Sequence, residues 1–369
     1  MPRRPSVGGR SRRKSGNRTA RVGEWMTSQQ KVLEAAGELL RRYHVFLASS
    51  HVRLDCDGLA AELALFHVLE GLGKRVHIVN ADPMARVLRF LPGSERVTVV
   101  DEVNELPTDL EAVVVLDCPG LSRIGGVGAL LPVGLPILSI DHHRGTSPFG
   151  TVTLADTQAS STCELLYRAF EANDFPVPAE AATNLYAGIL SDTGRFCFSN
   201  TTAQALAVAS ELVRLGADPL TVGHHLYEDF LFEQLQLWAE VVESIDVVLD
   251  GRVAVAVITG EMLRRHGVSA EDTQDFAEIP RLVSGVEVGV LLRELPGEGE
   301  VKVSLRSRAS ADVNAVAVRL GGGGHRNAAG VVVAGTLSAA RAQVLEVVEE
   351  LLAGSVRPAG EDGDEGGVT

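Results

Sequence analysis

Cysteine is scarce in this chain of 369 residues, which contains only four. No two of them form a Cys-x-x-Cys pair, so the spacing gives no indication of a structural zinc site. We interpret all four as small, buried residues; the alternative is a redox-sensitive thiol or one next to a metal. The four are Cys56, Cys118, Cys163 and Cys197.

Long apolar runs are also missing, so the sequence predicts no membrane-spanning helix. Residues 1–28 contain Arg and Lys but no apolar core segment, and we therefore expect no secretory signal. Together with the few cysteines, this predicts a cytoplasmic protein. The segment 1–28 is either a basic disordered arm or the result of a start misassigned upstream of Met26, and a transit peptide is a third alternative.

Aromatic residues make up only 5% of the chain, and the balance of charge is acidic. The net charge is −14, yet residues 1–28 carry eight Arg or Lys and one Glu, which leaves the remainder at about −21. Nonspecific affinity for long nucleic acid depends on phosphate neutralisation by Lys and Arg, so an acidic body argues against a long duplex. An anionic substrate must then meet a local positive site, which favours a short substrate.

Short apolar runs rich in β-branched residues alternate with helical segments in the first part of the chain. This alternation predicts a parallel α/β sheet, in which ligands gather at the carboxyl ends of the strands. Residues 160–236 are expected to be mostly helical. The predicted strands are 44–49, 75–80, 97–100, 112–116 and 137–140, and the predicted early helices are 28–43 and 58–72.

From about residue 245 the pattern changes to strands, predicted at 245–249, 253–258, 286–292 and 301–305, with helices at 311–320 and 338–353. We predict an α/β protein with an N-terminal parallel-sheet domain and a smaller C-terminal α+β domain, and with the active site in the cleft between them. The predicted units are a basic disordered tail at 1–28, the first domain at 29–230, a linker helix at 231–244, the second domain at 245–355 and an acidic disordered tail at 356–369.

Carboxylates and histidines follow four apolar runs. We interpret each run as a strand, so that these polar residues lie at its carboxyl end. Carboxylates in such positions are costly to desolvate unless something pairs with them, and few basic residues lie nearby in the sequence. A bound pair of cations is the simplest partner. The residues are His51, Asp55 and Asp57, then Asp117, then Asp141, His142 and His143, and finally Asp192.

Two imidazoles and four carboxylates without thiolates suit Mn²⁺, Mg²⁺ or Fe²⁺ better than structural zinc. Six ligands exceed the need of one ion, whereas two ions about 3.5–4 Å apart and bridged by one Asp use them efficiently. Such a site activates a bridging water and clamps a phosphoryl oxygen, which predicts metal-assisted phosphoester hydrolysis. His224 and His225 have no such acidic partner, and we interpret them as an ordinary helix surface or helix contact.

Four consecutive glycines, Gly321 to Gly324, precede His325 and Arg326. Such a run exposes backbone N–H groups, permits positive φ and can form an anion nest. Taken alone, the glycine run would be explained as a flexible hinge, and the alternating polar strand before it as a solvated strand face. Beside a predicted metal site, the two together predict phosphate recognition. That strand places Lys302, Ser304, Arg306 and Arg308 on one face. The predicted substrate-binding residues are Ser304, Arg306, Arg308, Gly322, Gly323, Gly324, His325 and Arg326.

These motifs resemble the DHH phosphoesterase family, in particular its nanoRNase and pAp phosphatase group, which adds a DHH-associated C-terminal domain. The resemblance covers about residues 30–355. It implies a hydrolase of short oligoribonucleotides (nanoRNA) and of 3′-phosphoadenosine 5′-phosphate (pAp), with mononucleotide bisphosphates and short RNA as its partners and no membrane. The matching segments are 140–143, 159–162, 188–194, 198–202 and 321–330.

The resemblance also implies a role for each site residue. Asp141 would orient a ligand, His143 would meet the substrate phosphate, and Arg306 and His325 with the glycine run would grip the terminal phosphate or nucleotide. Two Mn²⁺ ions are the expected cofactors, with Mg²⁺ or Co²⁺ as substitutes. A homodimer is one of the oligomeric states compatible with the resemblance. The first metal would be held by His51, Asp55 and Asp117, and the second by Asp57, Asp117, His142 and Asp192.

Three departures from the family pattern, in two motifs, affect loop geometry and substrate preference. Leu54 stands where the family usually has Pro, and Ala60 and Ala61 replace its Gly-Ser pair; after Asp-His-His the chain has Thr146 where the group often has Asn. The alternatives that share the metal site are a cyclic- or linear-dinucleotide phosphodiesterase, a RecJ-like single-strand exonuclease, and a pyrophosphate- or polyphosphate-hydrolysing enzyme. A non-catalytic nucleotide-binding protein is the alternative of another class, and the intact ligand set argues against it.

Overall fold

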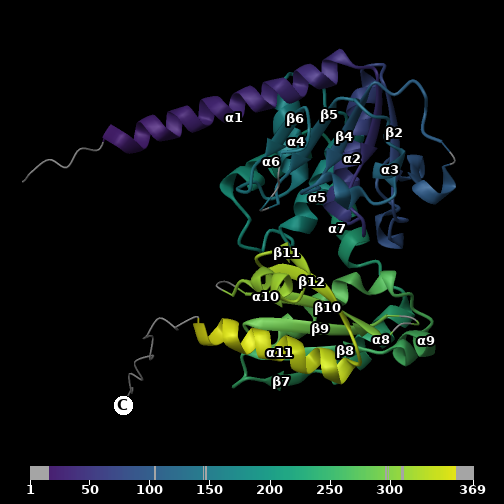
Figure 1. Ribbon diagram of the computed structural model, residues 1–369, viewed down its shortest axis with the longest axis vertical. Helices are drawn as coiled ribbons and strands as arrows, with labels where there is room; N and C mark the ends of the chain where they lie inside the picture. Colours follow the sequence, from purple (N-terminus) through teal and green to yellow (C-terminus); the bar gives the residue numbers. More distant parts are fainter. Residues whose placement is uncertain are drawn as a thin grey trace, which may run out of the picture.

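The computed structural model describes residues 16–354 except 104, 144, 146, 147, 296, 298, 309 and 310. Figure 1 shows two bodies, one with the elements up to α7 and one from α8 onward. Each body contains a six-stranded sheet. This confirms the predicted α/β fold with an N-terminal parallel sheet and a second sheet in the C-terminal part. None of the helices in the described ranges is long and apolar enough to cross a membrane.

The first sheet has the strand order β3-β2-β1-β4-β5-β6, and every neighbouring pair is parallel. The order reverses between β1 and β4, so the carboxyl ends of these two central strands border the crevice where such sheets bind ligands. The short edge strand β6 was not predicted from the sequence. The strands are β1 Val45–Ser49, β2 Arg75–Asn80, β3 Val97–Val99, β4 Ala112–Leu116, β5 Ile137–Asp141 and β6 Val152–Ala155.

A thick helical layer covers one face of this sheet, with Phe46 and Phe170 fully buried between them. The opposite face is covered by short elements around Ile124 and Val127. The helices are α1 Gly16–Arg42, α2 Cys56–Gly71, α3 Val127–Leu130, α4 Thr162–Ala172, α5 Ala179–Asp192, α6 Ala203–Arg214 and α7 Pro219–Tyr227, with 3₁₀ turns η1 Arg86–Leu88, η2 Ser94–Arg96, η3 Val100–Glu102 and η4 Leu121–Ile124.

Helix α1 begins at Gly16, twelve residues before the predicted helix start at Ser28. The added segment contains no proline and includes several good helix formers, so the periodic helix that follows extends into it. The part of the expected disordered tail from Gly16 to Ser28 is therefore helical. Residues 1–15 and the predicted acidic tail at 356–369 lie outside the described residues.

The second sheet has the order β11-β12-β10-β9-β8-β7 and is antiparallel except for the β8–β9 pair. Helices α10 and α11 pack on one face, and α8 and α9 pack with the turn η5 in a separate core. The elements are α8 Phe232–Glu243, β7 Asp246–Val248, β8 Val253–Ile258, α9 Gly260–His266, η5 Glu271–Glu278, η6 Pro280–Leu282, β9 Val288–Glu294, β10 Glu300–Ser307, α10 Val313–Arg319, β11 Gly323–His325, β12 Ala328–Ala334 and α11 Leu337–Gly354.

The glycine run forms an edge strand where the sequence suggested an open loop. Residues Gly323–His325 pair with β12. A Cβ atom at Gly322 or Gly324 would overlap the backbone of the neighbouring strand, at Gly330 and Ala328. These glycines are therefore explained in part by close strand packing, which requires the absence of a side chain.

Candidate functional site

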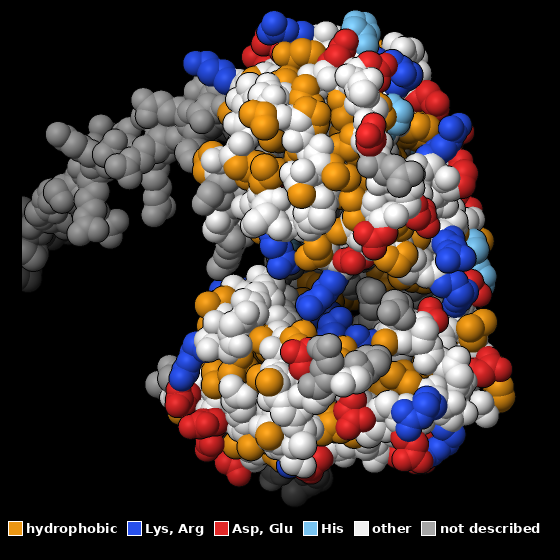
Figure 2. Space-filling model, turned by 45° about the vertical axis from the view of Figure 1, so that its right-hand side comes forward, with side chains coloured by type: hydrophobic (Ala, Val, Ile, Leu, Met, Phe, Trp, Pro, Cys, Tyr) orange, Lys and Arg blue, Asp and Glu red, His pale blue; other side chains and the backbone are white. Residues whose placement is uncertain are grey.

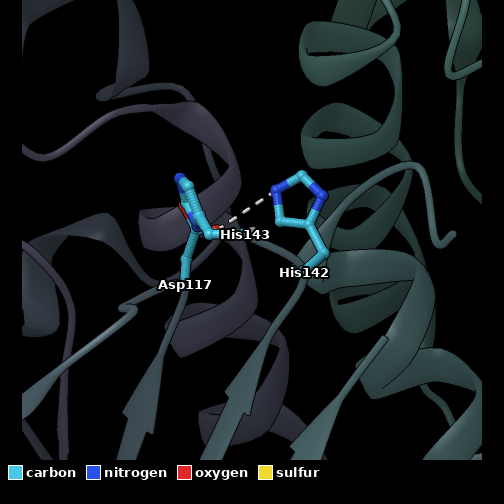
Figure 3. Close-up of side chains that lie close together, drawn as sticks. All are labelled: Asp117, His142 and His143. Carbon is cyan, nitrogen blue, oxygen red and sulfur yellow. Dashed lines mark ion pairs between the residues drawn. The ribbon is translucent and has the colours of Figure 1, made fainter. Parts of the chain in front are cut away.

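Asp117 lies at the centre of a buried cluster at the carboxyl end of β4. It has a left-handed backbone (φ 56°), and its two carboxylate oxygens face different partners. Oδ2 lies 3.4 Å from Nε2 of His51, and Oδ1 lies 3.5 Å from Nε2 of His142 and 3.5 Å from Nδ1 of His143. Figure 3 shows both DHH-segment imidazoles beside Asp117. This carboxylate is thus shared between two groups of candidate ligands.

The first group consists of His51, Asp55 and Asp117, whose ligand atoms lie within 4.8 Å of one another. Nδ1 of His51 bonds the carbonyl oxygen of Val52 at 2.8 Å, which makes Nε2 the candidate ligating nitrogen. Nε2 lies 3.6 Å from Oδ2 of Asp55. Asp55 is also the N-cap of α2 and accepts a hydrogen bond from the Gly58 backbone N–H at 3.1 Å, which fixes its carboxylate.

The second group consists of Asp57, His142 and Asp192. Nε2 of His142 lies 3.9 Å from Oδ2 of Asp57 and 3.2 Å from Oδ2 of Asp192. Asp57 is fully buried and accepts hydrogen bonds from the backbone N–H groups of Thr162 (2.7 Å) and Cys163 (3.0 Å) at the start of α4. The N-terminus of a helix stabilises an anion, so α4 holds this carboxylate in place.

The position of Asp192 differs from the one predicted from the sequence. We expected it at the end of a strand, but it is the last residue of helix α5. The segment before it is rich in Ala and Leu, which favour a helix, and its apolar residues are buried because α5 packs between other helices. Three of the four segments follow strands, and the fourth reaches the cluster from a helix C-terminus.

His143 is held by Asp141, the last residue of β5. Nδ1 of His143 lies 2.7 Å from Oδ1 of Asp141, which is completely buried. Burial opposes protonation of this imidazole, but the charge of Asp117 and the bond to Asp141 raise the pKa of His143 to about 9. In the metal-free cluster these two carboxylates therefore favour the protonated ring, which donates hydrogen bonds.

The cluster contains more carboxylate groups than nearby positive charges can neutralise. Burial and the charge of Asp117 raise the pKa of Asp57 and of Asp192 well above the usual range. Burial lowers the pKa of His51, but Asp55 and Asp117 outweigh it and raise that pKa to about 12. Protons offset part of this charge in the metal-free cluster, and bound divalent cations would take their place. Oxygen and imidazole donors in two groups around one shared carboxylate fit a pair of such ions.

Thr162, Asn200 and Gly188 support the cluster, and sequence analysis assigned them no role although all three lie in matching segments. Oγ1 of Thr162 donates to Oδ1 of Asp117 at 2.9 Å. The amide of Asn200 donates to the carbonyl oxygens of Ser160 (2.9 Å) and Asp192 (3.0 Å), which ties the loop after α5 to the start of α4. The signal for these residues was their place in the motifs 159–162, 188–194 and 198–202.

Three of the four cysteines are buried, as predicted, but Cys197 is exposed. It lies in the loop after α5, where Oγ of Ser199 donates a hydrogen bond to Oδ1 of Asn327 in the second domain at 2.9 Å. Burial raises the pKa of Cys163 well above its usual value, so this thiol stays neutral beside Asp57.

A cleft of about 640 Å³ joins the cluster to the second domain. Figure 2 shows Lys and Arg side chains gathered in the hollow between the two bodies. Asp55, His142 and Asp192 line it from the first domain. The predicted substrate-binding residues that line it are Ser304, Arg306, Gly323, Gly324 and Arg326.

Three other predicted substrate-binding residues are placed differently. Gly322 packs against β12, and Arg308 is exposed beyond the end of β10; neither lines the cleft. The side chain of His325 lies outside the described part of the structure. His225 of α7 also lines the cleft and stacks on Phe90, with ring centroids 4.6 Å apart, as a helix contact would.

Comparisons with known proteins agree with this two-domain arrangement. The model described as the DHH family N-terminal domain matches residues 46–189, and that of the DHHA1 domain matches residues 250–354. The bifunctional oligoribonuclease and PAP phosphatase NrnA of Thermus thermophilus is 36% identical over 82% of this chain and 89% of its own length. The Bacillus subtilis protein of the same name is 28% identical over 79% and 91%.

A solved structure has the same fold. It is that of an exopolyphosphatase-related protein from Bacteroides fragilis, with a TM-score of 0.79 and 26% sequence identity. The match covers 88% of this chain and 96% of that one. Both domains are therefore part of the shared architecture.

Proposed function

Since the chain belongs to the DHH family of phosphoesterases, we propose that it hydrolyses short oligoribonucleotides and pAp with two bound divalent ions. The observation that carries this proposal is the shared carboxylate of Asp117, which faces one ligand group with each oxygen. The names of the two relatives, as oligoribonuclease and PAP phosphatase, support the choice of substrate.

We assign the ligands from the two groups described above. His51 and Asp55 complete one site with Asp117, and the other site adds three residues to the same bridging carboxylate. When bound, two ions, Mn²⁺ by preference, supply activation of a water and charge neutralisation at the phosphoryl group. The ligands of the second site are Asp57, Asp117, His142 and Asp192.

His143 acts on the substrate as a hydrogen-bond donor. Asp141 holds its Nδ1, so its other nitrogen is the one that meets a non-bridging phosphoryl oxygen. Negative charge grows on such oxygens in the transition state, and a fixed cationic donor stabilises it. Asp141 in turn keeps the imidazole oriented and protonated.

The second domain binds the part of the substrate that does not react. Ser304 and Arg306 project from β10 into the cleft, and Arg326 faces the same space. A cleft of about 640 Å³ has the size of a site for small ligands. Because the body of the protein is acidic, a long strand outside the cleft is not attracted to it, which favours short substrates.

Hydrolysis assays with Mn²⁺ test this function. The substrates are pAp, 5′-labelled RNAs from dinucleotides to long strands, cyclic di-AMP and pyrophosphate, and Asp117→Ala is the control. Activity on pAp and the shortest RNAs that is lost in the control supports the proposal. Preference for long strands, the cyclic dinucleotide or pyrophosphate would support metal-dependent hydrolysis but contradict the proposed substrate. No activity on any of these compounds would favour a non-catalytic binding protein.

A further inference from the structure

The cleft wall formed by the second domain carries charges of both signs. The basic residues Arg281, Lys302, Arg306 and Arg326 line it together with the acidic residues Asp272, Asp275 and Glu278. The summed field of such a wall is weak, so it cannot hold an anion by net charge alone. Recognition then depends on which guanidinium groups are fixed and which of their edges face the cleft.

Glu278 fixes two of these guanidinium groups with one carboxylate. Its Oε1 accepts a hydrogen bond from Nε of Arg306 at 2.6 Å. Its Oε2 accepts from Nε and Nη2 of Arg281 at 2.9 and 2.7 Å. All three side chains are mostly shielded, with exposed fractions of 27% for Glu278, 23% for Arg306 and 20% for Arg281. Charge-assisted bonds in such a setting orient both arginines.

Small neighbouring residues in the sheet leave room for the Arg306 guanidinium to point its Nη2 edge into the cleft. Its neighbours in register are Gly289 on β9 and Ala328 on β12, and both are small. Nε is held by Glu278, and Nη1 donates to the carbonyl oxygen of Leu305 at 3.1 Å. Nη2 has no hydrogen bond to any described residue, and the side chain lines the cleft.

Arg281 is seated by the same glycine and reaches the first domain. A Cβ atom at Gly289 would stand 2.7 Å from the backbone nitrogen of Arg281, so only glycine lets η6 lie this close to β9. The guanidinium then lies over the ring of Phe198, 5.3 Å from its centroid. Phe198 belongs to the loop that follows the metal-ligand candidate Asp192, and both Phe198 and Arg281 line the cleft.

We propose that Glu278 is a positioning residue that holds Arg281 and Arg306 as a paired site for the second phosphate of the substrate, the one that is not cleaved. The group of three side chains, two guanidinium groups and one carboxylate, carries one net positive charge. The carboxylate occupies the Nε edges, so the remaining N–H groups are directed at a phosphate. This inference rests on the proposed function, because it requires a substrate with two anionic groups such as pAp.

The test compares Glu278→Gln and Glu278→Ala with wild type on two substrates, pAp and bis(p-nitrophenyl) phosphate, which has no second phosphate. We expect KM for pAp to rise about tenfold in Glu278→Gln and further in Glu278→Ala, with kcat within about twofold and the diester kinetics unchanged. The matched control is Glu287→Gln, because Glu287 pairs with Arg252 at 2.6 and 3.1 Å in the same domain but does not line the cleft.

The sign of the change separates positioning from simple repulsion. A carboxylate that only repels anions would lower KM for pAp when it is neutralised, so a lower or unchanged KM overturns the proposal, as does equal loss on both substrates. Arg281→Gln should also raise KM, and its effect should not add to that of Glu278→Gln, since the two act as a unit. If the wild-type protein cleaves the diester but not pAp, the proposed function is wrong. If it cleaves pAp and Glu278→Gln has the same kinetics, only the positioning role of Glu278 is wrong.

Discussion

Gly188 of α5 lies directly against the carboxylate of Asp57. A Cβ atom at this position would stand 2.8 Å from Oδ1 of Asp57 and would overlap Sγ of Cys163. Asp57 is held from the other side by backbone N–H groups at the start of α4, so it has no room to retreat. A methyl group at position 188 must therefore displace a candidate metal ligand or the helix that carries it.

Gly188→Ala is expected to weaken metal binding by roughly 10- to 100-fold, the usual range for changes that disturb a ligand's support. Calorimetric titration of the metal-free protein with Mn²⁺ measures this. Cys163→Ala removes the sulfur that a new methyl would overlap, so the double variant should recover part of the affinity. Wild-type affinity in Gly188→Ala would show that Asp57 is not a ligand or that α5 moves freely.

Thr162→Val tests the hydroxyl that bonds the shared carboxylate. The change removes the 2.9 Å bond to Oδ1 of Asp117 and keeps the backbone bond to Asp57. We expect about tenfold lower Mn²⁺ affinity and a parallel loss of activity at limiting metal, because an unsupported bridging ligand is free to rotate. Thr162→Ser retains the hydroxyl and should behave like wild type. Equal affinities for the Val and Ser variants would contradict the role.

The sequence was sufficient to place the candidate ligands that follow strands. Apolar β-branched runs predicted β1, β4 and β5 to within a residue, and the carboxyl ends of parallel strands meet at one edge. His51, Asp117 and His142 could therefore be grouped before the structure was known. Asp192 could be included in the cluster but not placed, because which helix end reaches the sheet edge depends on how α5 packs against α2.

The cleft wall of the second domain could not be predicted from the sequence, for physical reasons. A glycine run has the same sequence signal whether it forms an anion nest or a strand packed against another backbone, and here Gly322 and Gly324 do the latter. Glu278 and Arg281 lie in short 3₁₀ turns without periodicity. Only the sheet register, which places Gly289 beside Arg306, brings them to the cleft wall.

Metal affinity should increase with pH. Without metal, His51 holds its proton, since Asp55 and Asp117 raise its pKa to about 12, and the pKa of Asp57 is also raised. Ligands must lose these protons to bind a cation, so binding releases protons and is favoured as pH rises. Titrations with Mn²⁺ at pH 6 to 8 in two buffers of different ionisation enthalpy measure the number released. Binding without proton release would contradict this charge state for the metal-free cluster.

Glu62 makes the folded protein less stable as pH rises. It is fully buried on α2, and Oε2 accepts a hydrogen bond from the amide of Asn80 at 2.7 Å, while the other oxygen has no partner among the described residues. Burial raises its pKa from 4.5 to about 8. Between these values the folded state keeps a proton that the unfolded state has lost, so raising the pH favours unfolding, by at most about 1.4 kcal/mol per pH unit.

Glu62→Gln should remove this dependence, because glutamine stays neutral and still offers an oxygen to Asn80. We expect the variant to match wild type near pH 5 and to become progressively more stable than it toward pH 8, as the contribution of Glu62 to wild-type stability is lost. Urea unfolding of both proteins in chelator across this range measures the difference, in which the other titrating groups cancel. Parallel pH profiles would mean that Glu62 is ionised in the folded state and that its charge is offset by a partner near Asn80.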